Sequence, residues 1–159
     1  MAGRAGNQCY APRGVGEIQY IELADPAAGN PFIFTMADAA GDVQYIARLI
    51  FLRFQFVTDA TAPARFVTNY STHGDAPYNV LNEWRPPAAD TQAASLTRQY
   101  VYQPGLPFHN LVYASGFHHY LPADVWLLPG ARLSQAITAI AAGDQISNVK
   151  IGLQRWQVG

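Results

Sequence analysis

The chain has 159 residues, enough for one domain that buries roughly 70% of its unfolded surface. Charged residues make up only 13% of it and hydrophobic residues 50%, so a good part of the surface is expected to face other protein. The ten basic residues are spread along a chain of net charge -1, which excludes a nucleic-acid footprint, and no run approaches the ~20 apolar residues of a membrane-spanning helix.

The first 17 residues are predicted to form an extended N-terminal arm, followed by a single domain over residues 18–159. The arm contains four glycines, has almost no aliphatic side chains and shows no periodicity. Ordering a residue costs ~1–2 kcal/mol in backbone entropy, so the arm is expected to become ordered only on a partner. The predicted attachment residues are Arg4, Tyr10 and Arg13. Two arginines are too few for a genome-binding arm, so the expected partner is a protein.

Turn signals recur along residues 18–159, with short apolar runs between them, a pattern typical of a sandwich or a barrel. The longest predicted strand covers residues 43–60. Its first half is apolar on both faces and its second half on one face, as expected for a central strand that emerges from between two layers. Arg53 in this strand is either a paired buried charge or the point at which its face leaves the core.

Two further segments alternate between apolar and polar residues and are predicted strands. Residues 94–102 place Ala94, Leu96, Tyr100 and Tyr102 on one face. The segment "SNVKIGLQRW" places Val149, Ile151 and Leu153 opposite Asn148, Lys150 and Gln154.

The segment between them, "RLSQAITAIAAGDQIS" (132–147), fits a helix and a strand almost equally well. On a helix, five apolar residues form one stripe: Leu133, Ala136, Ile137, Ile140 and Ala141. On a strand, Leu133 and Ile137 share a face opposite Arg132, Ser134 and Thr138. A Pro-Gly turn precedes the segment and no Ser, Thr or Asp caps its start, which slightly favours a strand. The pattern alone leaves both alternatives open.

Three segments carry a family resemblance. They are "ARLIFLRFQFVTDATAPARFVTNY", "TQAASLTRQYVYQPG" and "LPADVWLLPGARLSQAITAIAAGDQISNVKIGLQRW", within roughly residues 45 to 157. Their features are an apolar strand ending in Thr-Asp-Ala, an arginine a few residues on, a "QTAS"-like segment and a "LPxG…GDQIS" ending. In these features the chain resembles a family of tailed-bacteriophage virion proteins. The shared motifs are signatures of turns and core, not of catalysis.

The resemblance implies a fold and a function. Proteins of this kind are similar to β-sandwich or jelly-roll decoration (cement) proteins, which sit on the outside of a capsid, often as trimers. It also implies that residues 132–141 form a strand. The expected fold is therefore all-β: an antiparallel, jelly-roll-like β-sandwich with an extended N-terminal arm.

The histidines are the strongest candidates for chemistry. "GFHHYLPADVWLLPG" is similar to the metal motif of the cupins, with His118, His119 and Asp124 as ligands and His109 as a third histidine. However, adjacent side chains on a strand point to opposite faces, so His118 and His119 are not expected to share a metal. No G-x-S-x-G elbow and no phosphate-binding loop occurs in the sequence. We therefore predict no catalytic residue, no metal and no cofactor.

The aromatic residues support an alternative function. Trp84, Trp126, Trp156 and the nine tyrosines could form a sugar-binding platform, although core packing and protein contacts explain them equally well. The alternative is a carbohydrate-binding or receptor-contact module of a head or tail fibre.

The prediction is a non-enzymatic structural protein of the virion, a decoration protein on the outer capsid surface of a particle assembled in the host cytoplasm. Its expected partners are the major capsid protein or other virion proteins, not nucleic acid or a membrane. A homotrimer is expected because so little charge leaves too little polar surface for a monomer. The residues predicted at the oligomer interface are Tyr100, Tyr102, His109, His118 and Tyr120.

Overall fold

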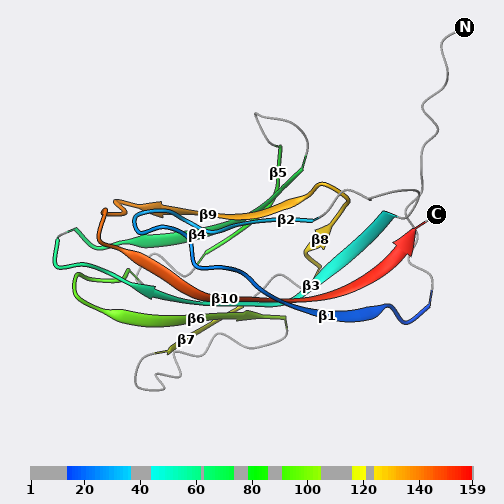
Figure 1. Cartoon of the computed structure of the whole chain (residues 1–159), viewed down its shortest axis with the longest axis horizontal. Coiled ribbons are helices and arrows are strands. Elements are labelled where there is room, and N and C mark those ends of the chain that lie inside the picture. The colour runs from blue at the N-terminus through cyan, green and yellow to red at the C-terminus, as the bar shows by residue number, and fades with distance from the viewer. Residues whose placement is uncertain are drawn as a thin grey trace, which may run out of the picture.

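The computed structural model describes residues 14–36, 44–61, 63–73, 79–85, 91–104, 116–120 and 124–158, with only the backbone described for 116–120. Within these ranges the chain forms ten strands and no helix (Figure 1). The strands are β1 (Glu17–Glu22), β2 (Ile33–Thr35), β3 (Gln44–Val57), β4 (Phe66–His73), β5 (Asn79–Trp84), β6 (Thr97–Gln103), β7 (Gly116–Tyr120), β8 (Trp126–Leu127), β9 (Arg132–Thr138) and β10 (Gln145–Val158). The prediction of an all-β chain is confirmed. This part of the chain accordingly contains no helix that could cross a membrane.

The strands form two sheets that lie one above the other (Figure 1). The larger sheet has the order β1-β10-β3-β6-β7, with β8 also paired to β3, and the smaller one has the order β2-β9-β4-β5. Neighbouring strands are antiparallel except β6 and β7, which run parallel. Two packed sheets of this kind are the arrangement of a β-sandwich.

The core lies between the two sheets and draws side chains from both. The larger sheet contributes Leu52, Phe54 and Phe56, and the smaller one contributes Val67 and Leu133. Each such side chain contributes roughly 1.5–3 kcal/mol when it is fully buried. Burial between the layers therefore holds the sheets together.

The two tyrosines of β6 belong to this core. Tyr100 and Tyr102 are 1% and 0% exposed. Their rings stack on Phe54, with centroid separations of 5.0 Å and 6.1 Å. The prediction that they lie at an oligomer interface is therefore wrong. Large aromatic residues that alternate with polar ones fit a core face as well as a contact surface, and here they fill the core.

The central position predicted for residues 43–60 is confirmed, because β3 lies between β10 and β6. Ala47 and Leu49 face the main core, whereas Ile46 packs in a second cluster with Trp156 and Val158. The two faces of the first half of β3 are thus covered, as predicted. Arg53 is exposed, so it marks the point at which its face leaves the core.

The ambiguous segment forms β9, which pairs with β2 on one side and β4 on the other. Leu133 and Gln135 point inward and are buried. The strand ends at Thr138, because Ala139 has a φ of 56° and turns the chain away. The prediction of a strand is confirmed, with an end three residues earlier than the expected residue 141.

Candidate functional site

The predicted functional residues are described only in part. Arg4, Tyr10, Arg13 and His109 lie outside the described residues. His118, His119 and Tyr120 belong to β7, where the backbone alone is described. Asp124 is exposed. Across the ranges for which side chains are described, no three His, Cys, Asp or Glu residues gather as metal ligands would.

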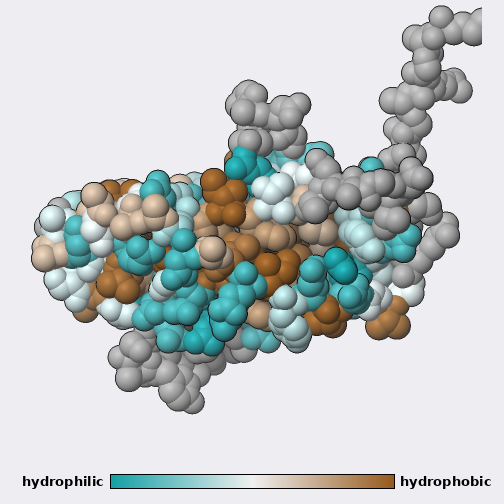
Figure 2. Space-filling model, in the orientation of Figure 1, coloured by the Kyte–Doolittle hydropathy of each residue, from teal (hydrophilic) through white to brown (hydrophobic). Residues whose placement is uncertain are grey.

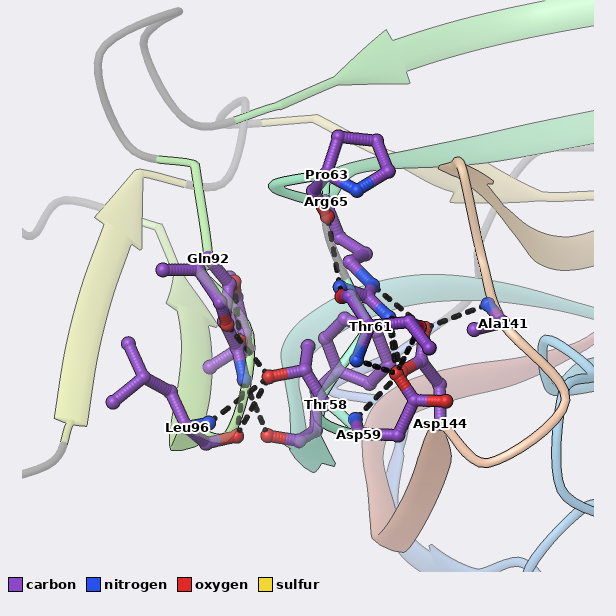
Figure 3. Close-up of polar contacts among 12 residues, drawn as sticks. Thr58, Asp59, Thr61, Pro63, Arg65, Gln92, Leu96, Ala141 and Asp144 are labelled. Atoms are coloured by element: carbon purple, nitrogen blue, oxygen red, sulfur yellow. Dashed lines mark hydrogen bonds and ion pairs between the residues drawn. The ribbon is translucent and has the colours of Figure 1, made fainter.

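The segments that carry the family resemblance converge on one buried polar cluster around Arg65 (Figure 3). Arg65 is 1% exposed. Its Nε and Nη2 donate to Asp144 Oδ2 and Oδ1, both at 2.9 Å, and Nη2 also donates to Asp59 Oδ1 at 2.6 Å. Nη1 donates to the backbone carbonyl oxygens of Pro63, at 2.8 Å, and of Thr61. The guanidinium thus joins the chain after β3 to the turn before β10.

Hydrogen bonds fix both carboxylates of this cluster in place. Asp144 also accepts hydrogen bonds from the backbone N–H groups of Asp59 and Ala141, both at 2.8 Å. Hydrogen bonds from the side chain and the backbone of Thr61, together with Arg65, lower the pKa of Asp59 below its usual range. The hydrogen bonds from Arg65 to Asp144 raise the pKa of the guanidinium, which stays charged.

Gln92 extends the cluster into the core (Figure 3). Its Nε2 donates to the backbone oxygens of Phe56 and Leu96, at 2.9 Å and 2.8 Å, and its Oε1 accepts from the Tyr100 hydroxyl at 3.1 Å. Its backbone exchanges two hydrogen bonds with that of Arg65, each 2.8 Å long. The side chains of Arg65 and Asp144 are 0% exposed, so a substrate cannot reach this ion pair. We infer that this buried polar cluster stabilises the fold.

An open polar site lies on the outer face of the larger sheet. It is a pocket of about 180 Å³ lined by Arg53 and Gln55 of β3, Gln99 of β6, and Asn148 and Lys150 of β10. Several of these residues lie on the polar sides of predicted strands, but the sequence pattern does not show that they are close together. Their proximity depends on the strand order β10-β3-β6, which joins segments far apart in the chain.

Hydrogen bonds hold the side chains of this pocket in place. Arg53 Nη2 donates to Gln99 Oε1 at 3.0 Å, and Asn148 Nδ2 donates to Gln55 Oε1 at 3.2 Å. Lys150 Nζ lies 3.7 Å from a carboxylate oxygen of Glu22. No carboxylate in the described part of the chain pairs with Arg53.

An aromatic surface adjoins the pocket. Tyr20 is 75% exposed, and its ring centroid lies 5.9 Å from that of Phe51. Tyr20 and Phe51 flank Gly152 on the two neighbouring strands. Two residues further along each strand, on the same face of the sheet, lie Glu22, Lys150 and Arg53. Tyr20 of the edge strand β1 is therefore an exposed aromatic residue of this face.

The tryptophans do not form the sugar-binding platform considered from the sequence. Trp84 is 5% exposed and Trp156 is 8% exposed. Trp126 is half-buried, with its ring centroid 5.4 Å from that of Trp156. Core packing accounts for these rings.

In comparisons with known proteins, no family model matches this chain, and neither a curated protein nor a solved structure gives a significant match.

Proposed function

We propose that this protein is a structural component of a tailed-phage virion, a decoration protein that stabilises the outer surface of the head by protein-protein contacts. Two kinds of support are combined: the family resemblance of residues 45 to 157 and the hydrophobic residues exposed at the surface. The protein has no catalytic role in this proposal.

The observation that carries the proposal is the character of the smaller sheet's edges. Edge strands of proteins that stay monomeric usually carry charges or prolines that block further pairing. Edge strand β2, "IFT", has no charge, and Ile33 in it is 53% exposed. At the opposite edge, Val80 and Leu81 of β5 are 56% and 48% exposed. Hydrophobic residues also reach the surface between hydrophilic ones in Figure 2. Such edges fit a protein that is covered by neighbours in an assembly.

The chain path supports the proposal at the level of topology. Strands β1 to β4 alternate between the larger and the smaller sheet, and after β5 the chain returns to the larger sheet at β6. We propose that the sandwich is a jelly roll, an architecture that occurs in viral capsid proteins as well as in lectins and cupins. Because this architecture hosts unrelated functions, it adds support without deciding the function.

The proposed assembly is a homotrimer bound to the major capsid protein or another virion protein. We propose that Arg4, Tyr10 and Arg13 of the arm make the attachment. Gly14 and Val15 are hydrogen-bonded to β10: Trp156 Nε1 donates to the carbonyl oxygen of Gly14 at 3.1 Å, and Gln154 Nε2 donates to that of Val15 at 2.6 Å. Residues before Gly14 can therefore be removed without breaking these contacts.

The test is a binding experiment with heads assembled without this protein. Full-length protein is expected to bind them saturably, and protein that lacks residues 2–13 is expected to bind at least tenfold more weakly. Equal melting temperatures would show that the deletion leaves the domain folded. Failure of the full-length protein to bind would overturn the proposed function, and equal binding of the two forms would overturn the role of the arm.

A further inference from the structure

Arg53 is the starting point of the inference, because it is an exposed cation on the outer face of the larger sheet with no carboxylate partner among the described residues. Its one hydrogen bond to a described residue, that to Gln99, orients the guanidinium, and the other N–H groups have no partner among the described residues. Lys150 next to it is paired with Glu22. A planar guanidinium with free donors is suited to bidentate binding of a carboxylate.

Three amide side chains surround this cation. Gln55 Oε1 accepts from Asn148, and Gln99 Oε1 accepts from Arg53. The amide nitrogens of Gln55 and Gln99 and the amide oxygen of Asn148 have no partner among the described residues. The pocket thus offers fixed donors and an acceptor to a ligand rich in hydroxyl groups.

A backbone irregularity places one of these amides. The pairing of β10 with β3 shifts by one residue between Ser147 and Lys150, and Asn148 in this bulge has a φ of 54°. Its backbone N–H is held by Asp25 Oδ1 at 2.9 Å. Bulges often re-aim side chains next to binding sites, and an unfavourable φ persists only where the surroundings hold it.

The aromatic surface lies beside this polar group. The row of Tyr20 and Phe51 is two residues along the strands from the row of Lys150 and Arg53, a spacing of roughly 6–7 Å. Phe51 covers Gly152, because a Cβ atom at Gly152 would lie 2.3 Å from the Phe51 ring. The ring is thereby held against the sheet next to the exposed ring of Tyr20.

We propose that the outer face of the larger sheet binds a saccharide that carries a carboxylate. Arg53 binds the carboxylate, the amides of Gln55, Gln99 and Asn148 bind hydroxyl groups, and Tyr20 packs against the apolar face of a neighbouring sugar ring. A pocket of about 180 Å³ is smaller than the ~300 Å³ at which pockets for drug-sized ligands begin, so it holds one sugar unit while the rest of the chain lies across the open face. This site does not depend on the proposed attachment to a capsid.

An array of immobilised saccharides tests the proposal. It presents sialyl-, glucuronyl- and galacturonyl-terminated chains, each beside the matching chain without the carboxylate. The protein is expected to bind one of the acidic classes and to bind its neutral counterpart at least tenfold more weakly. Calorimetry with the best ligand in solution then measures the affinities of the variants, with hexaglutamate as the comparison for an acidic protein segment.

The variants separate the pocket from the rest of the surface. R53Q is expected to weaken binding at least tenfold, Y20A to weaken it several-fold, and R53K to retain part of the affinity. The matched control is R85Q, which alters an arginine with an exposed side chain at the end of β5 in the other sheet. Unchanged melting temperatures are expected because Arg53 and Tyr20 are exposed.

Four outcomes would overturn the proposal: no binding to any acidic saccharide, equal binding to the neutral counterpart, unchanged affinity of R53Q, or hexaglutamate bound as tightly as the saccharide. The last outcome would assign the face to an acidic protein partner.

Discussion

At the scale of single residues, the fold depends on an ion pair that water does not reach. Arg65 and Asp144 have fully buried side chains, and Asp144 accepts four hydrogen bonds from Arg65, Asp59 and Ala141. A buried charge that loses its partner is costly, because the remaining charge is desolvated without compensation. The motifs Thr-Asp-Ala and "GDQIS" therefore matter for stability.

The substitution D144N is expected to lower the free energy of unfolding by about 3–5 kcal/mol, because it leaves Arg65 buried without its main partner. The matched control is E17Q, which breaks the pair between Glu17 and Arg155, 2.8 Å long but exposed, and is expected to cost about 0–1 kcal/mol. Urea denaturation of the variants measures both effects. Equal losses of unfolding free energy in the two variants would contradict the stabilising role of the buried cluster.

Acid is expected to destabilise the protein by protonating Asp59 in the buried polar cluster. Hydrogen bonds from Thr61 and the Arg65 guanidinium lower the pKa of Asp59 in the folded state below its value in the unfolded chain, about 3.9. Its contribution to stability is therefore fully present above pH ~4 and is lost as the pH falls through the folded-state pKa. Urea midpoints between pH 7 and pH 2.5 should fall less steeply for D59N than for the wild type. Parallel curves would show that Asp59 makes no such contribution.

At the scale of elements, the sequence predicted four of the ten strands individually and none of their irregularities. The alternation of apolar residues was sufficient for β3, β6 and β10, and the family resemblance decided β9. The bulge in β3 was not predictable from residues 43–60 alone, because it depends on the partner strand. Gly152 pairs with Phe51 and Leu153 with Leu49, which leaves Ile50 as the extra residue. This extra residue is the reason that Leu49 and Leu52 are both buried although they are three positions apart.

A glycine is expected to be needed at position 152 because the ring of Phe51 occupies the space of a Cβ atom there. The variant G152A should lose about 1 kcal/mol in the wild-type background, because the new methyl group displaces that ring. In the F51A background the same change should gain about 0.5–1 kcal/mol, since alanine loses less backbone entropy than glycine in a strand. Thermal and urea denaturation of the four proteins give the double-mutant cycle. The same sign in both backgrounds would rule out the proposed contact.

At the scale of the whole molecule, residue patterns predicted a fold of two packed sheets but not which strands are neighbours within each sheet. The pocket combines β3, β6 and β10, whose residues come from the middle and the end of the chain. No local pattern specifies that pairing, so the pocket was not predictable from the sequence. The alternation around Tyr100 and Tyr102 likewise shows that they share a face of the strand but does not show whether that face is buried, so their prediction as surface residues was wrong.

The exposed Val80 and Leu81 of edge strand β5 are expected to mediate self-association. Full-length protein should have the mass of a trimer in light scattering, and the double substitution V80K/L81K should convert it to a monomer with an unchanged melting temperature. L96K is the control, because Leu96 is 39% exposed but lies outside the strands. A monomeric wild type, or a trimer that persists in V80K/L81K, would contradict the assignment of this edge.

The central claim, that this chain is a structural protein on the outside of a phage head, is tested most directly by electron cryomicroscopy. Particles produced from the genome that carries the gene are compared with particles produced after deletion of the gene. The account predicts regularly spaced density on the outer head surface, fitted by the two-sheet domain, that is absent from the deletion particles. Identical head surfaces in the two reconstructions would contradict it, as would density for this domain in the tail or in a fibre.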